Sequence, residues 1–108
     1  MPNKYKNIPQ VTSDGVFDSK KEYERWCVLK LMERAGKISA LQRQVEYELI
    51  PKQRYKGKTI RAAHYIADFV YQENGQTIVE DVKGTKTDLY KLKKKLMLWR
   101  YGIMIKET

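Results

Sequence analysis

Residues 65–83 constrain the fold most, because they predict two β-strands joined by a tight turn. Asn74-Gly75 separates two runs rich in β-branched and aromatic residues, and this dipeptide is the strongest short-range signal of a two-residue β-hairpin. With Asn74 and Gly75 as the loop, five steps back along each strand from the first facing pair place Asp68 opposite Asp81. We therefore expect an antiparallel hairpin in a defined register.

The register predicts a shared face for two acids and a lysine. Side chains alternate between the faces of a sheet, so Asp68, Asp81 and Lys83 are expected on one face, and Glu80, which we interpret as structural, on the other. Like charges directly opposite each other destabilise a sheet, so a fold that keeps both acids is expected to use them. Mg²⁺ prefers hard oxygen ligands and is often held by one or two carboxylates. The pattern therefore predicts a divalent-cation site, with Mn²⁺ as a substitute for Mg²⁺.

Two helices are expected on either side of this hairpin. Ser19 to Glu22 carry a capping-box signature, which predicts a helix from Lys20 to about Ala35 that stops at Gly36. Its apolar residues occupy much of the circumference, so we expect it to be covered on more than one side. A second helix, capped by Thr87 or Asp88 and ending near Tyr101, has one apolar stripe at helical spacing: Leu89, Leu92, Leu96 and Trp99.

The remaining segments complete an α-β-β-β-α-β order around one small mixed sheet, an α/β (α+β) layer fold. Ile38–Ile50 and Ile103–Ile105 are predicted strands, and Lys52–Lys58 a basic loop. We expect residues 1–16 to be a loose basic N-terminal arm and residues 17–108 to be a single domain.

Charge indicates the partner. The chain has 108 residues with 22 Lys+Arg against 13 Asp+Glu, a net charge of +9, and so strong a basic balance favours a polyanion such as nucleic acid. No run reaches the 18 apolar residues of a membrane span, and the N-terminus has no signal-peptide core. With Cys27 as the only cysteine, these features predict a protein of the cytoplasm that does not contact membranes.

Asp68 followed by Asp81-Val82-Lys83 resembles the PD-(D/E)xK nuclease superfamily, which has a restriction-endonuclease-like core of the same element order. The segments FDSKKE, YIADFVY and VEDVKG look like a short phage-encoded family related to Holliday-junction resolvases. The resemblance runs from Phe17 to the C-terminus, and it departs at Ala67, where the superfamily name has Pro.

The resemblance implies roles for particular residues. Asp68 and Asp81 would bind the metal together with the main-chain carbonyl of Val82, and Lys83 would be catalytic. An acid on the first helix would face the site, Glu22 in the matching segment, with Glu24 as the rival on the helical wheel. The implied catalytic set is Asp68, Asp81, Lys83 and Glu22.

The resulting expectation is a Mg²⁺-dependent endodeoxyribonuclease selective for branched or Holliday-junction DNA in phage recombination or replication. It would act as a homodimer in the host cytoplasm. The alternatives are a non-catalytic nucleic-acid-binding module on a nuclease fold and, third, an RNA-directed protein. The basic residues expected to contact DNA phosphates are Lys86, Lys91, Lys94, Lys95, Lys52, Arg54, Lys56 and Lys58.

Overall fold

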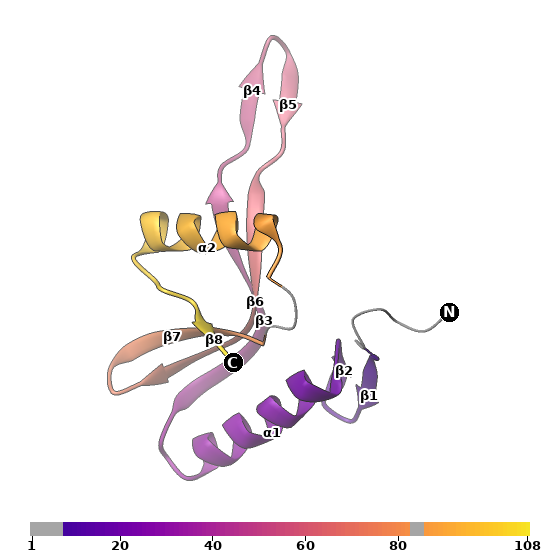
Figure 1. Ribbon diagram of the computed structural model, residues 1–108. Helices are drawn as coiled ribbons and strands as arrows, with labels where there is room; N and C mark the ends of the chain where they lie inside the picture. Colours follow the sequence, from indigo (N-terminus) through magenta and orange to yellow (C-terminus); the bar gives the residue numbers. More distant parts are fainter. Residues whose placement is uncertain (1–7, 83–85) are drawn as a thin grey trace.

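The computed structural model describes residues 8–82 and 86–108 and shows a mixed α+β chain (Figure 1). Its largest sheet has four strands in the order β3-β6-β7-β8. β6 pairs antiparallel with both β3 and β7, and β8 pairs parallel with β7. The strands are β3 (Ser39–Ile50), β6 (Ala63–Glu73), β7 (Gln76–Asp81) and β8 (Lys106–Glu107).

Two helices accompany this sheet, α1 (Lys20–Arg34) and α2 (Asp88–Tyr101). Together with the four strands they follow the expected α-β-β-β-α-β order. Two further hairpins were not expected. One pairs β1 (Gln10–Thr12) with β2 (Gly15–Phe17), and the other pairs β4 (Gln53–Tyr55) with β5 (Lys58–Ile60).

The β6–β7 hairpin confirms the predicted turn and register. Asn74 and Gly75 have φ angles of 51° and 77°, the pair of left-handed residues that a type I′ turn requires. The paired positions run in step from Glu73 opposite Gln76 to Phe69 opposite Glu80. One further step brings Asp68 and Asp81 to the end of the ladder.

α1 begins and ends where the sequence predicted. The Ser19 hydroxyl accepts a hydrogen bond from the Glu22 N–H at 3.1 Å, and Gly36, with φ of 78°, follows the last turn. The capping box is modified, because the Glu22 carboxylate accepts from the N–H of Asp18. The expected cover on more than one side is wrong: α1 buries one side only, and Val28 and Leu31 are exposed.

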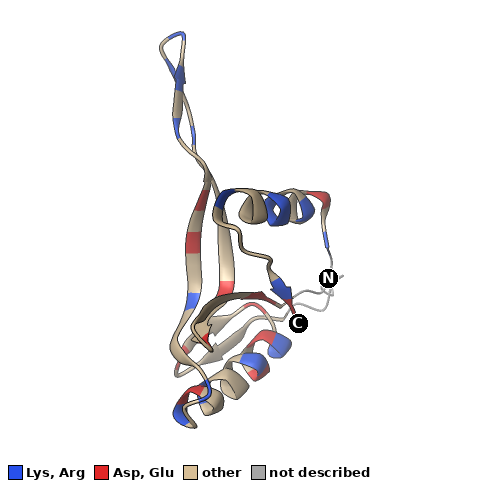
Figure 2. Cartoon of the chain, turned by 90° about the vertical axis from the view of Figure 1, so that its left-hand side faces the viewer, with Lys and Arg blue, Asp and Glu red and all other residues tan. Residues whose placement is uncertain are grey.

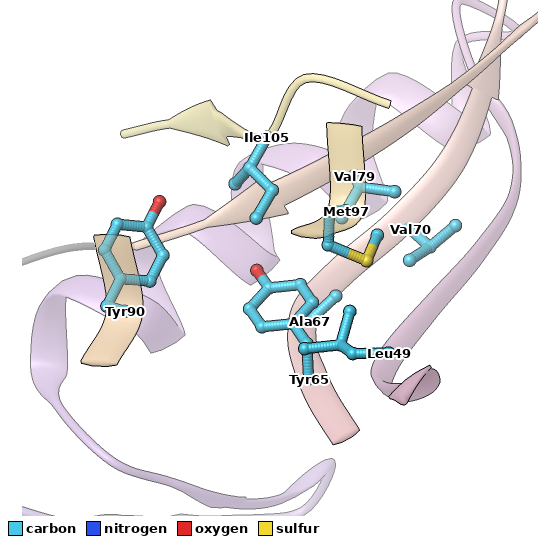
Figure 3. Packing of buried hydrophobic residues seen from close by; sticks show 8 residues of the cluster. All are labelled: Leu49, Tyr65, Ala67, Val70, Val79, Tyr90, Met97 and Ile105. Atoms are coloured by element: carbon cyan, nitrogen blue, oxygen red, sulfur yellow. The ribbon is translucent and has the colours of Figure 1, made fainter. Parts of the chain in front are cut away.

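Two apolar cores lie against the sheet. The core beside α2 is shown in Figure 3 and consists of Leu49, Tyr65, Ala67, Val70, Val79, Tyr90, Met97 and Ile105. The core beside α1 consists of Phe17, Leu29, Ile38, Phe69 and Tyr71.

The odd-numbered residues of β6 change from the α2-side core to the α1-side core at Asp68. Ala67 and Phe69 are two residues apart, yet they belong to different cores, so the usual alternation of side chains is broken between them. On the neighbouring strand Gln44 lies between the partners of these two residues and has φ of 54°. The left-handed Gln44 therefore lies where the alternation of β6 side chains changes, next to Asp68.

α2 faces the core differently from the prediction. The buried residues are Tyr90 and Met97, whereas Leu89, Leu92 and Trp99 of the predicted stripe are exposed. The reason is that the Tyr90 ring packs in the core while its hydroxyl donates to Glu107 at 2.7 Å, a combination that an aromatic residue with a polar tip allows. Leu96 is partly buried beside this core.

Three segments also differ from their predictions. The last strand is Lys106–Glu107 instead of 103–105, and Ile105 is a core residue just before it. Residues 52–58, predicted to be a loop, contain most of the β4–β5 hairpin. Residues 10–17 form the β1–β2 hairpin, so this part of the predicted loose arm is ordered by strand pairing, whereas residues 1–7 lie outside the described residues.

Candidate functional site

The structure brings Asp68 and Asp81 together at the end of the β6–β7 ladder. Their carboxyl groups are within hydrogen-bonding reach of each other. The Val82 N–H donates to Asp68 Oδ2 at 2.8 Å, and the Tyr65 hydroxyl donates to Asp81 Oδ2 at 2.7 Å. Asp81 is buried and Asp68 is half-buried, so both acids are held in defined positions away from bulk water.

The contact between these acids has a clear electrostatic cost. Burial, together with the hydrogen bond and the negative charge of Asp81, raises the pKa of Asp68 to about 8, against the lowering effect of the Val82 N–H. Two carboxylates that share a site cannot both ionise readily. Without a cation, the pair therefore retains one proton near neutral pH.

Glu22 is the acid of α1 that faces this pair. It is buried, and its carboxylate accepts from the Asp18 N–H and from Gln44 Nε2, each at 3.2 Å. Burial is the main cause that raises its pKa, and the charge of Asp81 raises it further. The rival Glu24 points to solvent, with its side chain 64% exposed and 3.8 Å from Lys20 Nζ.

Glu80 points away from the acid pair, as predicted, and is fully buried on the α1 side. The Arg25 guanidinium donates two hydrogen bonds to the Glu80 carboxylate, from Nε at 2.6 Å and from Nη2 at 2.8 Å. The Tyr71 hydroxyl donates a third at 2.8 Å. Burial alone would raise the pKa of Glu80, but the hydrogen bonds from Arg25 and Tyr71 outweigh it and lower the pKa. Glu80 is thus a paired structural charge.

Sequence reasoning missed the tyrosines beside the acids. Burial, followed by the charge of Asp81, raises the pKa of Tyr65, so its hydroxyl remains a proton donor to Asp81. Tyr90 also lies in the field of Asp81 and Asp68, and its pKa is raised chiefly by burial. No local signal marks either residue, because both read as ordinary apolar positions of a strand and a helix.

The predicted phosphate-binding lysines in and just before α2 fall into two groups. Lys86 Nζ lies 2.9 Å and Lys94 Nζ 3.3 Å from Glu107. Hydrogen bonds lower the pKa of Glu107 to about 2; the Tyr90 hydroxyl has the largest effect, and the two lysines add to it. Lys91 and Lys95 are exposed, so they are the more accessible pair for an anionic ligand.

The donor set fits a metal ion held by two carboxylates. Among the described residues, no three Asp, Glu, His or Cys side chains are arranged to hold one, and the Glu22 carboxylate is already occupied by its own donors. Mg²⁺ keeps several waters and often takes only one or two protein carboxylates, which Asp68 and Asp81 supply. Lys83, predicted to be catalytic, lies outside the described residues.

Comparison with known proteins gives a family but no activity. A family model described as "Protein of unknown function (DUF1064)" matches residues 2–107. No match was found among the curated proteins or among the solved structures. Within the described residues, no helix is long and apolar enough to cross a membrane.

Proposed function

The chain belongs to the DUF1064 family of proteins of unknown function, and from its site we propose that it is a Mg²⁺-dependent endodeoxyribonuclease. The observation that carries the proposal is the pairing of Asp68 with Asp81, which raises the pKa of Asp68 to about 8. Such a pair is costly for a fold that makes no use of it. A divalent cation would displace the shared proton and neutralise both charges.

The residues of the chain have distinct tasks in this proposal. Asp68 and Asp81 hold the ion, with the carbonyl of Val82 as a further oxygen ligand. The Val82 N–H and the Tyr65 hydroxyl fix the orientation of the two carboxylates, the role that outer-shell donors have in metal sites. When bound, the ion polarises a phosphoryl oxygen and lowers the pKa of a bound water.

Lys83 and Glu22 assist without being required as ligands. Lys83 directly follows Val82, and its ammonium orients the attacking water or stabilises charge that develops on the phosphate. Glu22 acts through its charge on Asp81, because its own oxygens accept hydrogen bonds from Asp18 and Gln44.

The basic surface supports a DNA substrate, and the fold's small size supports selection by DNA shape. Lys91 and Lys95 of α2 are exposed, and the net charge is +9.

Cutting paired strands of a branched substrate requires two active sites, which a two-fold homodimer provides. Sedimentation velocity, with and without four-way junction DNA, checks this assembly: a chain that stays monomeric while cutting paired strands contradicts it.

Cleavage assays test the proposal. Linear, nicked, flapped and four-way DNA are incubated with Mg²⁺, with Mn²⁺ or with EDTA. Cleavage should require a metal ion. Asp68→Asn and Asp81→Asn should each slow it by more than about a hundredfold, since even outer-shell partners of metal sites cost 10–100-fold. DNA affinity should be unchanged or higher, because each variant removes a negative charge.

Glu24→Gln is the matched control, because it makes the same acid-to-amide change at an exposed position of α1. It should cut at the wild-type rate. Normal cleavage by Asp68→Asn and Asp81→Asn would place the active site elsewhere. DNA binding without any metal-dependent cleavage would instead support the non-catalytic binding module.

A further inference from the structure

β4 and β5 form a two-stranded hairpin that extends beyond the four-stranded sheet (Figure 1); we call residues 53–60 the outer hairpin. Its two-residue loop is Lys56-Gly57, with φ angles of 49° and 76°, so the turn is again of the left-handed type that hairpins favour. Every residue from 51 to 61 is exposed. The outer hairpin therefore contributes to neither core.

An isolated two-stranded hairpin is at best marginally stable in water, and the contacts of this hairpin with the described residues are local. The Arg54 guanidinium donates to Thr59 Oγ1 at 2.9 Å and to the Gly57 carbonyl at 3.4 Å. Lys56 Nζ lies 5.3 Å from the centroid of the Tyr55 ring. These contacts order the tip, but they leave Tyr55 and Ile60 63% and 46% exposed.

The charged side chains in and around the outer hairpin are all basic. Residues 49–67 contain no Asp or Glu, and Figure 2 shows the basic positions along the outer hairpin without an acidic neighbour. The acidic residues begin again at Glu48 and Asp68, at the base of the strands. The basic residues of the region are Lys52, Arg54, Lys56, Lys58 and Arg61.

The dimensions fit one polyanion in particular. The major groove of B-form DNA is about 12 Å wide and admits a two-stranded β-ribbon. Lys58 is ten residues before Asp68, which at about 3.3 Å per residue corresponds to roughly 33 Å along the ribbon. One turn of B-DNA is about 34–36 Å long. The longest dimension of the molecule, 52 Å, accommodates this reach.

We propose that the outer hairpin enters the major groove of B-form duplex DNA about one helical turn from the phosphate that lies at Asp68 and Asp81. This inference rests on the proposed function for its DNA partner, and it adds the position and the groove. Lys56 and Lys58 at the tip neutralise phosphates on either side of the groove, while Tyr55 and Ile60 lie against base edges. Duplex RNA is excluded, because its major groove is deep and narrow.

Binding to a linear DNA duplex of about three helical turns, labelled with fluorescein and held in EDTA, tests the hairpin without cleavage. The variant Lys56→Ala with Lys58→Ala should lower the salt slope of binding by about two units and weaken binding at about 0.1 M salt at least about tenfold. The charge-matched control, Arg34→Ala with Lys37→Ala at the exposed end of α1, should retain the wild-type slope. Duplex RNA should not compete.

Dimethyl sulfate footprinting then locates the contact. The wild type should protect guanine N7, a major-groove atom, about one helical turn from the cleavage position. The double variant should lose this protection. Replacement of residues 51–62 by Asn-Gly, which directly joins the paired residues Ile50 and Ala63, should have the same effect while the urea unfolding transition persists.

The outcomes separate this inference from the proposed nuclease. DNA binding that depends on the outer hairpin, by a protein that does not cut DNA, supports the hairpin contact and overturns the nuclease. Metal-dependent cutting with an unchanged salt slope and footprint in the double variant overturns the hairpin contact alone. Minor-groove protection, equal competition by duplex RNA, or a hairpin needed only for self-association would also overturn it. Failure of the wild type to bind duplex DNA overturns the hairpin contact, and failure to bind four-way DNA as well overturns both.

Discussion

At the scale of single residues, Asp68 should destabilise the metal-free protein as the pH rises. The raised pKa of about 8 means that the native chain holds a proton that the unfolded chain has lost above pH 4. The free energy of unfolding therefore falls between about pH 4 and pH 8. Asp68→Asn can accept from the Val82 N–H and donate to Asp81. In EDTA it should stabilise the protein by about 1–3 kcal/mol at pH 8 and change little at pH 4.

Urea unfolding measures this change in stability. Glu80→Gln is the control, because it makes a similar acid-to-amide change at the residue next to Asp81 on β7. The lowered pKa of Glu80 means that its stabilisation exists above its unfolded pKa and is lost as the pH falls. Its loss leaves Arg25 in a partly buried site without its charged partner, so Glu80→Gln should cost about 2–4 kcal/mol at pH 7. Destabilisation by Asp68→Asn at pH 8 would contradict the assigned environment of the acid pair.

At the scale of elements, α2 offers a direct test of which face it buries. Met97 is fully buried and Trp99 is 79% exposed. Met97→Ala should therefore lower the free energy of unfolding by about 2–5 kcal/mol, whereas Trp99→Ala should stay within about 0.5 kcal/mol. Urea unfolding of the two variants decides between the observed face and the stripe predicted from sequence. A larger loss for Trp99→Ala would favour the predicted stripe.

The elements that the sequence predicted well are those with local signals. Asn74-Gly75 determines the β6–β7 turn and its register through backbone geometry alone, and Ser19 and Gly36 mark the ends of α1. The buried face of α2 could not be read in this way, because hydropathy ranks Leu92 and Trp99 above Tyr90. Tyr90 can be buried because its ring packs in the core and its hydroxyl donates a hydrogen bond to Glu107, seventeen residues away.

At the scale of the whole molecule, local geometry predicted the acid pair, whereas Glu22 was expected only from the family resemblance and Tyr65 was not expected at all. Two-residue hairpin geometry alone indicates that Asp68 and Asp81 meet. The approach of Glu22 from α1 and the Tyr65 hydroxyl bond to Asp81 depend on how helix and strands pack. The outer hairpin was missed because Lys56-Gly57 lacks apolar strands on either side, so its residues looked like a loop.

The central claim is that Asp68 and Asp81 hold a divalent cation, and calorimetric titration of the protein with Mg²⁺ or Mn²⁺ tests it most directly. The wild type should bind the ion at the acid pair and release close to one proton at pH 7, because the pKa of Asp68 is raised to about 8. Asp68→Asn and Asp81→Asn should bind the ion much more weakly, and Glu24→Gln should bind it as the wild type does. Absence of binding to the wild type, or equal binding by all variants, would contradict the claim.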